Sequence, residues 1–149
     1  MSPPTAPPSE RLRILLAEDE PDIRQYVRDI LAARDDVDVV EAPSGEDALR
    51  RLEHEWFDVV VSDQRMGLVD GLAVLERARE RSPDAPRVMI TGYAELELVE
   101  DAKNRGHVDR FLAKPFSPDA FLDEVAPLLD TRRVRAARQL AFDRALKVP

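Results

Sequence analysis

The stretch VVVSD at residues 59–63 places three consecutive β-branched apolar residues directly before a serine and an aspartate. A strand with one face in water alternates apolar and polar residues, whereas a strand buried on both faces is apolar throughout. The run therefore predicts a central strand over Val59–Ser62, in a parallel sheet with helices on both faces. Asp63 follows at the carboxyl end of this strand.

Outward from this run, short apolar segments alternate with longer segments of helical periodicity. The other expected strands are Arg13–Ala17, Val37–Ala42, Arg87–Thr91 and Arg110–Ala113. The expected helices are Pro21–Ala33, Ser44–Glu53, Gly71–Arg81, Ala94–Arg105 and Ser117–Leu129. This alternation predicts an α/β fold in which helices are doubly wound around a five-stranded parallel sheet.

The chain divides into three expected regions. Four prolines among the first eight residues predict a disordered, proline-rich lead over residues 1–10. Residues 11–130 form the expected domain, and residues 131–149 add a basic helical tail. Pro127 should kink or end the helix before this tail, because proline removes a helical hydrogen bond. The small, alanine-rich apolar face of the tail fits a weak dimer helix, a helix docked on the domain, or a linker. Its arginines leave a basic patch for nucleic acid as a fourth alternative.

Composition excludes several kinds of chemistry. With no cysteine and two histidines in 149 residues, thiol catalysis and thiolate zinc sites are ruled out. The net charge of −8 is uneven, since residues 132–149 carry +5 and residues 1–131 carry −13; an acidic domain argues against nucleic acid as a partner. No apolar run approaches the roughly 18 residues of a membrane span, and no signal peptide is visible. We therefore expect a soluble, cytoplasmic protein.

Polar residues follow four of the expected strands. Glu18 and Asp19 come after the first, Asp63 after the third, Thr91 ends the fourth and Lys114 follows the fifth. In such sheets the site lies at the carboxyl ends of the strands. Two like charges 4 Å apart repel by about 4 kcal/mol at an effective dielectric near 20, so cations must compensate. Lys114 supplies one positive charge, and Mg²⁺, which prefers oxygen ligands, could supply the rest. With the hydroxyl of Thr91, this set of groups predicts phosphoryl transfer to an aspartate.

The segments ILLAEDE, DVVVSDQRM with VDGL, VMITGYAE and FLAKPF, in this order and spacing, resemble the receiver domains of two-component response regulators. The resemblance covers roughly residues 11–130. It implies the fold of the chemotaxis response regulator, with the flavodoxin-like strand order 2-1-3-4-5. It also implies that Asp63 accepts a phosphoryl group from a sensor histidine kinase or a phosphotransfer protein, in a Mg²⁺-dependent phosphorelay.

The resemblance further implies roles for individual residues. Asp63 would share Mg²⁺ with Glu18, Asp19 and the backbone carbonyl of Arg65.

Phosphoryl oxygens would be bound by Thr91, by Lys114 and by the backbone N–H groups of Arg65 and Gly92. Phe111 corresponds to the aromatic residue that turns inward when the threonine moves toward the phosphoryl group. The switched surface, around the fourth helix, fifth strand and fifth helix, would bind an output partner or a second copy of the chain. The C-terminal tail is the other candidate for pairing with a second copy.

Two features of this sequence bear on the resemblance. In the family the Lys-Pro bond is commonly cis, so a cis bond is expected at Lys114-Pro115. Where the family usually has Met-Pro-Gly, this chain has Met66-Gly67-Leu68. The residue that tolerates positive φ thus moves one place forward, and a differently shaped or looser loop is expected beside Asp63.

Two other functions remain open. One is an interaction module that binds its partner without phosphorylation. The other is a Mg²⁺-dependent hydrolase with an aspartyl-phosphate intermediate. Haloacid-dehalogenase-type enzymes of this kind place a second acid two residues after the nucleophile, and Arg65 occupies that position here. We therefore expect a phosphoacceptor signalling domain, which promotes only its own phosphotransfer and dephosphorylation, and not a turnover enzyme.

Overall fold

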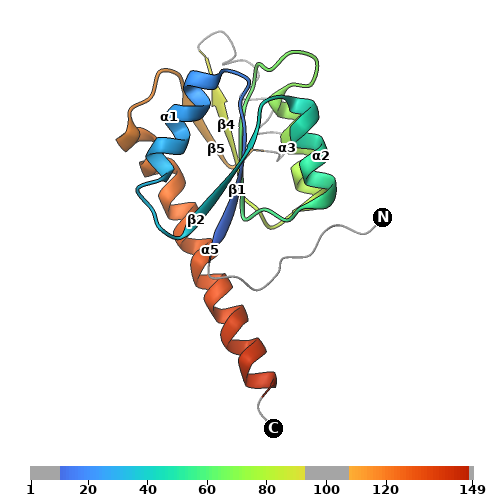
Figure 1. Cartoon of the computed structure of the whole chain (residues 1–149), viewed down its shortest axis with the longest axis vertical. Helices are drawn as coiled ribbons and strands as arrows, with labels where there is room; N and C mark the ends of the chain where they lie inside the picture. The colour runs from blue at the N-terminus through green and yellow to red at the C-terminus, as the bar shows by residue number, and fades with distance from the viewer. Residues whose placement is uncertain (1–10, 93–107, 148–149) are drawn as a thin grey trace.

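A computed structural model describes residues 11–92 and 108–147 of the chain (Figure 1). They contain a five-stranded, wholly parallel sheet with the strand order β2-β1-β3-β4-β5. The strands are β1 (Leu12–Ala17), β2 (Val37–Ala42), β3 (Val59–Asp63), β4 (Arg87–Thr91) and β5 (Arg110–Ala113). The expected doubly wound fold and its strand order are confirmed. The expected lead at residues 1–10 and the expected helix Ala94–Arg105 lie outside the described residues.

The described residues include four helices. They are α1 (Pro21–Leu31), α2 (Gly45–His54), α3 (Gly71–Arg81) and α5 (Pro118–Leu146). Ser44 and Ser117 are N-caps whose hydroxyl oxygens accept hydrogen bonds from the N–H groups three residues on, at 3.1 and 3.0 Å. Such caps satisfy N–H groups that have no partner within the helix.

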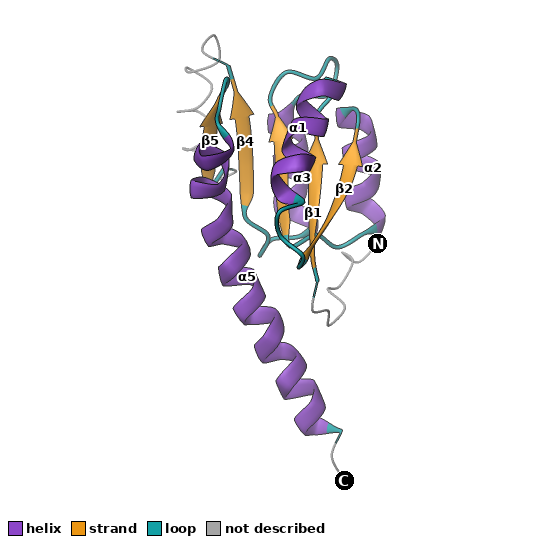
Figure 2. Cartoon of the chain, turned by 60° about the vertical axis from the view of Figure 1, so that its left-hand side comes forward, coloured by secondary structure: helices purple, strands orange, loops and turns teal. Residues whose placement is uncertain are grey.

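Two apolar layers enclose the sheet, with α1 and α5 on one face and α2 and α3 on the other (Figures 1 and 2). Alternation along β1 decides which residue enters which layer. Ile14 and Leu16 pack with α1 and α5, whereas Leu15 and Ala17 pack with α2 and α3. All four are 0% exposed, as expected for a central strand buried on both faces.

The helix that follows β5 does not end at Pro127, although an end there was one of the two outcomes expected. It continues through this residue to Leu146 as one 29-residue helix, so the tail is not a separate element. An internal proline costs a helix about 3 kcal/mol. Val125 and Leu129, on either side of Pro127, are both 0% exposed. Burying two such side chains stabilises the helix by about 3–6 kcal/mol, which offsets the proline.

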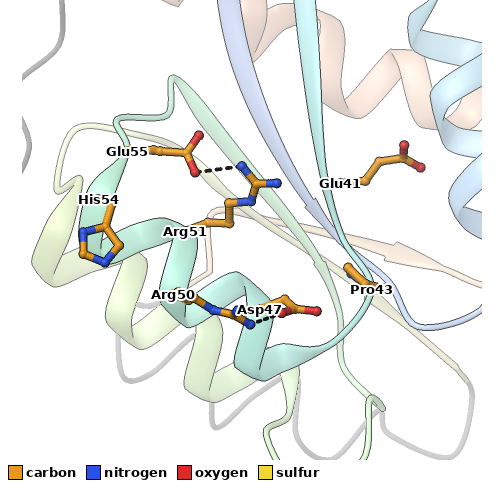
Figure 3. Close-up of a pocket in the computed structure, with 7 residues that line it drawn as sticks. All are labelled: Glu41, Pro43, Asp47, Arg50, Arg51, His54 and Glu55. Atoms are coloured by element: carbon orange, nitrogen blue, oxygen red, sulfur yellow. Dashed lines mark hydrogen bonds and ion pairs between the residues drawn. The ribbon is translucent and has the colours of Figure 1, made fainter.

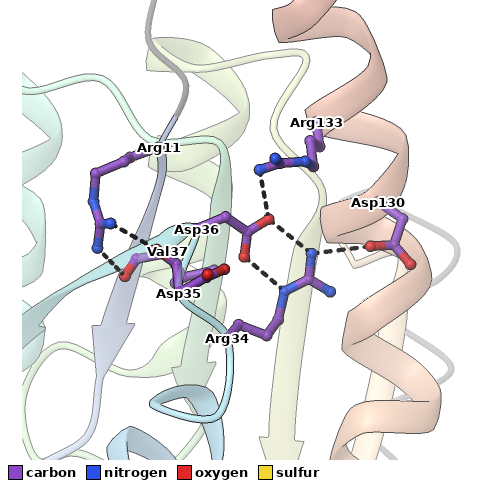
Figure 4. A network of polar contacts seen from close by, with 7 residues as sticks. All are labelled: Arg11, Arg34, Asp35, Asp36, Val37, Asp130 and Arg133. Atoms are coloured by element: carbon purple, nitrogen blue, oxygen red, sulfur yellow. Dashed lines mark hydrogen bonds and ion pairs between the residues drawn. The ribbon is translucent and has the colours of Figure 1, made fainter.

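Charged side chains attach α5 to the base of the sheet, opposite the carboxyl ends of the strands (Figure 4). Arg34, in the turn before β2, bonds both Asp36 at 3.0 Å and Asp130 of α5 at 2.9 Å, and Arg133 bonds Asp36 at 3.0 Å. The next turns of α5 extend beyond the domain (Figure 2). We call residues 134–147 the distal helix; because most of its residues are exposed, it is not docked on the domain.

No helix among the described residues is both long enough and apolar enough to cross a membrane.

Candidate functional site

The register of the sheet brings the polar strand-end residues to one rim. Ala17 pairs with Ser62, so Glu18 and Asp63 follow on adjacent strands. Asp63 pairs with Ile90, which puts Thr91 one residue further along β4. Thr91 pairs with Ala113, the residue before Lys114. The predicted convergence of these side chains is therefore a direct consequence of parallel pairing.

Lys114 links the two buried carboxylates of this rim. Its Nζ lies 3.1 Å from Asp63 Oδ2 and 3.8 Å from Glu18 Oε1. Glu18 is 0% exposed and Asp63 2% exposed, whereas the Lys114 side chain retains 24% exposure. Two carboxylates thus share a single lysine in a region from which water is largely excluded.

The pKa values of Glu18, Asp63 and Lys114 are all shifted, because two buried carboxylates face one lysine. Burial and the charge of Asp63 raise the pKa of Glu18 to about 8. Burial also raises the pKa of Asp63, although Lys114 opposes the shift. Burial lowers the pKa of the Lys114 ammonium group, but the charges of Asp63 and Glu18 outweigh it, so the net shift is upward. A further cation at the rim would stabilise both carboxylates in their ionised forms.

The oxygen atoms at the end of β1 fit a hard divalent cation. Glu18, Asp19 and Glu20 each offer one carboxylate oxygen, and the three lie within 4.8 Å of one another. Glu18 Oε2 is buried without a hydrogen-bond partner, which is costly unless something binds it. An all-oxygen donor set is what Mg²⁺ prefers. Sequence reasoning assigned Glu18 and Asp19 to the metal but not Glu20, the third acid of the same run at the end of this strand.

Thr91 is 2% exposed, and its hydroxyl donates to the Gly92 carbonyl at 2.9 Å. The Thr91 carbonyl accepts from the Lys114 N–H at 2.8 Å, which ties the ends of β4 and β5 together. Phe111, three residues before Lys114, is partly buried against the layer formed by α2 and α3. The Lys114-Pro115 bond is cis, as expected.

The loop after Asp63 takes the shape that its sequence requires. Gly67 has a φ of 88°, and no other described residue has a positive φ. Leu68 avoids that region and is fully exposed. The residue of this loop that takes positive φ is therefore Gly67, and a looser loop stays a prediction.

Gln64 supplies much of the hydrogen bonding in this loop, and sequence reasoning missed it. It is only 5% exposed, and both its main chain and its side chain bond the start of α3. A glutamine between an aspartate and an arginine gives no local signal of such a role.

A surface hollow of about 390 Å³ lies between α2 and the end of β2, and none of the predicted site residues lines it (Figure 3). Within the hollow, Arg51 bonds Glu55 at 3.0 Å and Arg50 bonds Asp47, whereas Glu41 bonds Arg28 of α1 at 2.9 Å. Most of its charged side chains are therefore already held by ion pairs. The hollow is lined by Glu41, Pro43, Asp47, Arg50, Arg51, His54 and Glu55.

A doubly wound parallel sheet with a buried aspartate, a lysine, a hydroxyl and an acidic oxygen cluster on its carboxyl rim defines a class, the receiver-type signalling domains. Sequence comparison agrees, because the family model of the response regulator receiver domain matches residues 14–126. The chain belongs to this family.

Relatives and solved structures are consistent with this membership. The C4-dicarboxylate transport transcriptional regulatory protein DctD of Pseudomonas aeruginosa is 37% identical over 135 residues, which are 88% of this chain and 28% of that protein. The response regulator receiver protein CpdR of Brucella abortus is 32% identical over 117 residues, 78% of this chain and 96% of that protein. A signal receiver domain of an HD domain-containing protein from Pseudomonas fluorescens Pf-5 superposes with a TM-score of 0.75 at 27% identity, over 83% of this chain and 98% of that one.

The chain spans 28% of DctD and 30% of the response regulator protein PilR of Pseudomonas aeruginosa, which is 32% identical over 136 residues and 91% of this chain.

Proposed function

We propose that this chain is a cytoplasmic phosphoacceptor, in which Asp63 receives a phosphoryl group from the phosphohistidine of a sensor kinase or phosphotransfer protein. The observation that carries the proposal is the position of Asp63, buried at the end of β3 with Lys114 Nζ 3.1 Å away and Glu18 beside it. Membership of the receiver family supports it.

In the proposed reaction a carboxylate oxygen of Asp63 attacks phosphorus, a P–O bond forms and the P–N bond to histidine breaks. The electron pair of the broken bond stays on the histidine nitrogen, which takes a proton from solvent. Lys114 stays in contact with the acceptor and neutralises charge on the incoming phosphoryl oxygens. The N–H groups of Arg65 and Gly92 donate to the same oxygens.

Glu18, Asp19 and Asp63, with the carbonyl of Arg65, would hold Mg²⁺, and Glu20 is a further oxygen donor close by. When bound, Mg²⁺ neutralises charge on the phosphoryl oxygens.

After transfer, the Thr91 hydroxyl leaves the Gly92 carbonyl and donates to a phosphoryl oxygen. Phe111 then turns inward beside it. The added charge and the two displaced side chains bias the surface around β5 and α5 toward a second conformation. The part of this surface expected from residues 94–105 lies outside the described residues.

The distal helix is the second part of the proposal. Val134, Phe142 and Leu146 are 50%, 61% and 69% exposed, and Phe142 and Leu146 lie one turn apart on the same side of the helix. We propose that this helix pairs with a second copy of the chain, which would cover these exposed apolar side chains.

A phosphotransfer assay tests the acceptor. With acetyl phosphate and Mg²⁺, wild-type protein should gain one phosphoryl group and Asp63→Asn none. Asp29→Asn, an exposed aspartate on α1, is the matched control and should be phosphorylated as wild type is. Equal phosphorylation of Asp63→Asn would reject Asp63 as the acceptor. Partner binding that is unchanged by phosphorylation would instead favour the phosphorylation-independent module.

A further inference from the structure

Gln64 follows the proposed acceptor directly, and all its hydrogen-bonding groups are engaged. Its N–H donates to the Ile90 carbonyl of β4 at 3.0 Å, and its carbonyl accepts from the Gly71 N–H at 2.9 Å. The main chain just after Asp63 is therefore fixed on two sides, by β4 and by the first residue of α3.

The side chain of Gln64 spans the same loop a second time. Its Oε1 accepts from the Leu72 N–H at 2.8 Å, and its Nε2 donates to Asp70 Oδ2 at 3.3 Å. The Leu72 N–H lies in the first turn of α3 and has no partner within that helix. Asp70 in turn caps α3 by accepting from the Ala73 N–H at 2.9 Å. One buried glutamine thus joins the end of β3 to the start of α3.

Only residues 65–69 lie between these attachment points. They contain Gly67, which takes a positive φ, and no proline that would restrict the backbone. Arg65, whose carbonyl and N–H the proposed function assigns to Mg²⁺ and to the phosphoryl group, is the first residue of this span. Its orientation therefore depends on how firmly residue 64 is held.

We infer that Gln64 is a positioning residue, which holds the Arg65 main chain in the geometry for Mg²⁺ and phosphoryl oxygens through its bonds to Asp70 and Leu72. The inference rests on the proposed function. It assigns to a glutamine side chain the restraint that a proline in this loop would otherwise provide.

The decisive experiment reverses one hydrogen bond. Gln64→Glu keeps an acceptor for the Leu72 N–H but sets a second carboxylate against Asp70 Oδ2. It should weaken Mg²⁺ binding by roughly 10-fold or more, the scale seen for residues that orient metal ligands, and slow phosphorylation by acetyl phosphate. Adding Asp70→Asn lets the new amide donate to the carboxylate introduced at position 64 while its oxygen still caps α3. This double variant should recover most of both properties.

Gln139→Glu is the matched control. Gln139 also donates to an aspartate, Asp143 at 2.9 Å, but it lies on the distal helix far from the rim. It should leave Mg²⁺ affinity and phosphorylation unchanged. Melting temperatures measured without Mg²⁺ separate positioning from loss of fold. A merely structural role would change the melting temperature and the Mg²⁺ affinity together, in Gln64→Glu and in the double variant alike.

The outcomes distinguish the two proposals. If wild type is phosphorylated and Gln64→Glu matches it in rate and Mg²⁺ affinity, the role of Gln64 is wrong and the acceptor proposal stands. Failure of the double variant to recover also overturns the role of Gln64. If wild type binds Mg²⁺ but is not phosphorylated, the acceptor proposal fails, and Mg²⁺ affinities across the variants still decide the role of Gln64. A wild type that neither binds Mg²⁺ nor is phosphorylated overturns both.

Discussion

Gly71 lies against the main chain of Asp63 so closely that a Cβ atom on Gly71 would stand 2.2 Å from the Asp63 carbonyl oxygen. The first residue of α3 thus touches the residue that we propose as the phosphoacceptor. Only glycine fits, because the contact is with backbone atoms that cannot rotate away. The start of α3 and the end of β3 are therefore fixed relative to each other by the absence of a side chain.

Gly71→Ala should separate α3 from the rim. We expect a loss of about 1–3 kcal/mol in the free energy of unfolding, the usual result of overpacking, together with slower phosphorylation of Asp63. Urea denaturation and phosphorylation by acetyl phosphate measure the two effects. Gly67→Ala is the comparison: a Cβ there meets no atom within 4 Å, so only its positive φ opposes the change, at a cost of about 1 kcal/mol. Normal phosphorylation of Gly71→Ala would show that this contact does not shape the site.

Mg²⁺ should raise the melting temperature of the chain. A ligand that binds only the folded state stabilises it by RT ln(1 + [L]/Kd), about 2.7 kcal/mol at one hundred times Kd. Glu18→Gln and Asp19→Asn should each reduce this shift, because each removes a charged oxygen from the acidic cluster. Asp22→Asn, on the first turn of α1, is the nearby control. A melting temperature that stays constant up to several millimolar Mg²⁺ would argue against the metal site.

Without a divalent cation, stability should fall as the pH rises from about 5 to 8. The pKa of Glu18 increases from its ordinary 4.5 to about 8 on folding, so the folded state holds a proton that the unfolded state has lost. This contribution is fully present below pH 4.5 and disappears as pH approaches 8; its size is roughly 1–4 kcal/mol. Denaturation at several pH values in EDTA should show the slope, and Glu18→Gln should flatten it. Hydrogen bonds with Arg34 lower the pKa of Asp36, so the stability that Asp36 contributes is lost only when the pH falls below about 4.

The base of α5 offers a test that is independent of the rim. Arg132 is 8% exposed; it lies over the Trp56 ring at 6.0 Å, donates to the Asp84 carbonyl at 3.2 Å and approaches Asp58 at 3.5 Å. Arg132→Met should cost about 2–4 kcal/mol, because it leaves the Asp58 carboxylate, whose side chain is only 14% exposed, without this cation. Arg133→Met, at an exposed ion pair, should cost about 1 kcal/mol or less. Similar losses in urea denaturation for the two variants would contradict this assignment.

The sequence predicted the sheet well because strand signals are local, and because parallel strands end at the same edge of a sheet. Val59–Val61 indicated a buried parallel strand, and parallel register then placed Asp63, Thr91 and Lys114 on one rim. Of the kink or end expected at Pro127, the end was wrong, because buried residues on either side stabilise the helix against the proline. Such tertiary burial is not visible in helix propensity. Gln64 was missed for a similar reason, because its partners on α3 are defined only once the chain has folded.

Self-association through the distal helix can be tested by solution mass. The double substitution Phe142→Ser with Leu146→Ser removes two large exposed apolar side chains from each copy and should weaken a dimer by roughly 100-fold or more. Ala136→Ser, which lies on the same helix but roughly 75° or more around it from both side chains, should leave the dimer intact. Salt separates pairing with a second copy from binding to an acidic surface. The arginines of two paired distal helices repel each other, so added salt should strengthen the dimer, whereas it would weaken attraction to an acidic partner. A wild-type chain that remains a monomer at high concentration and high salt would exclude pairing through this helix.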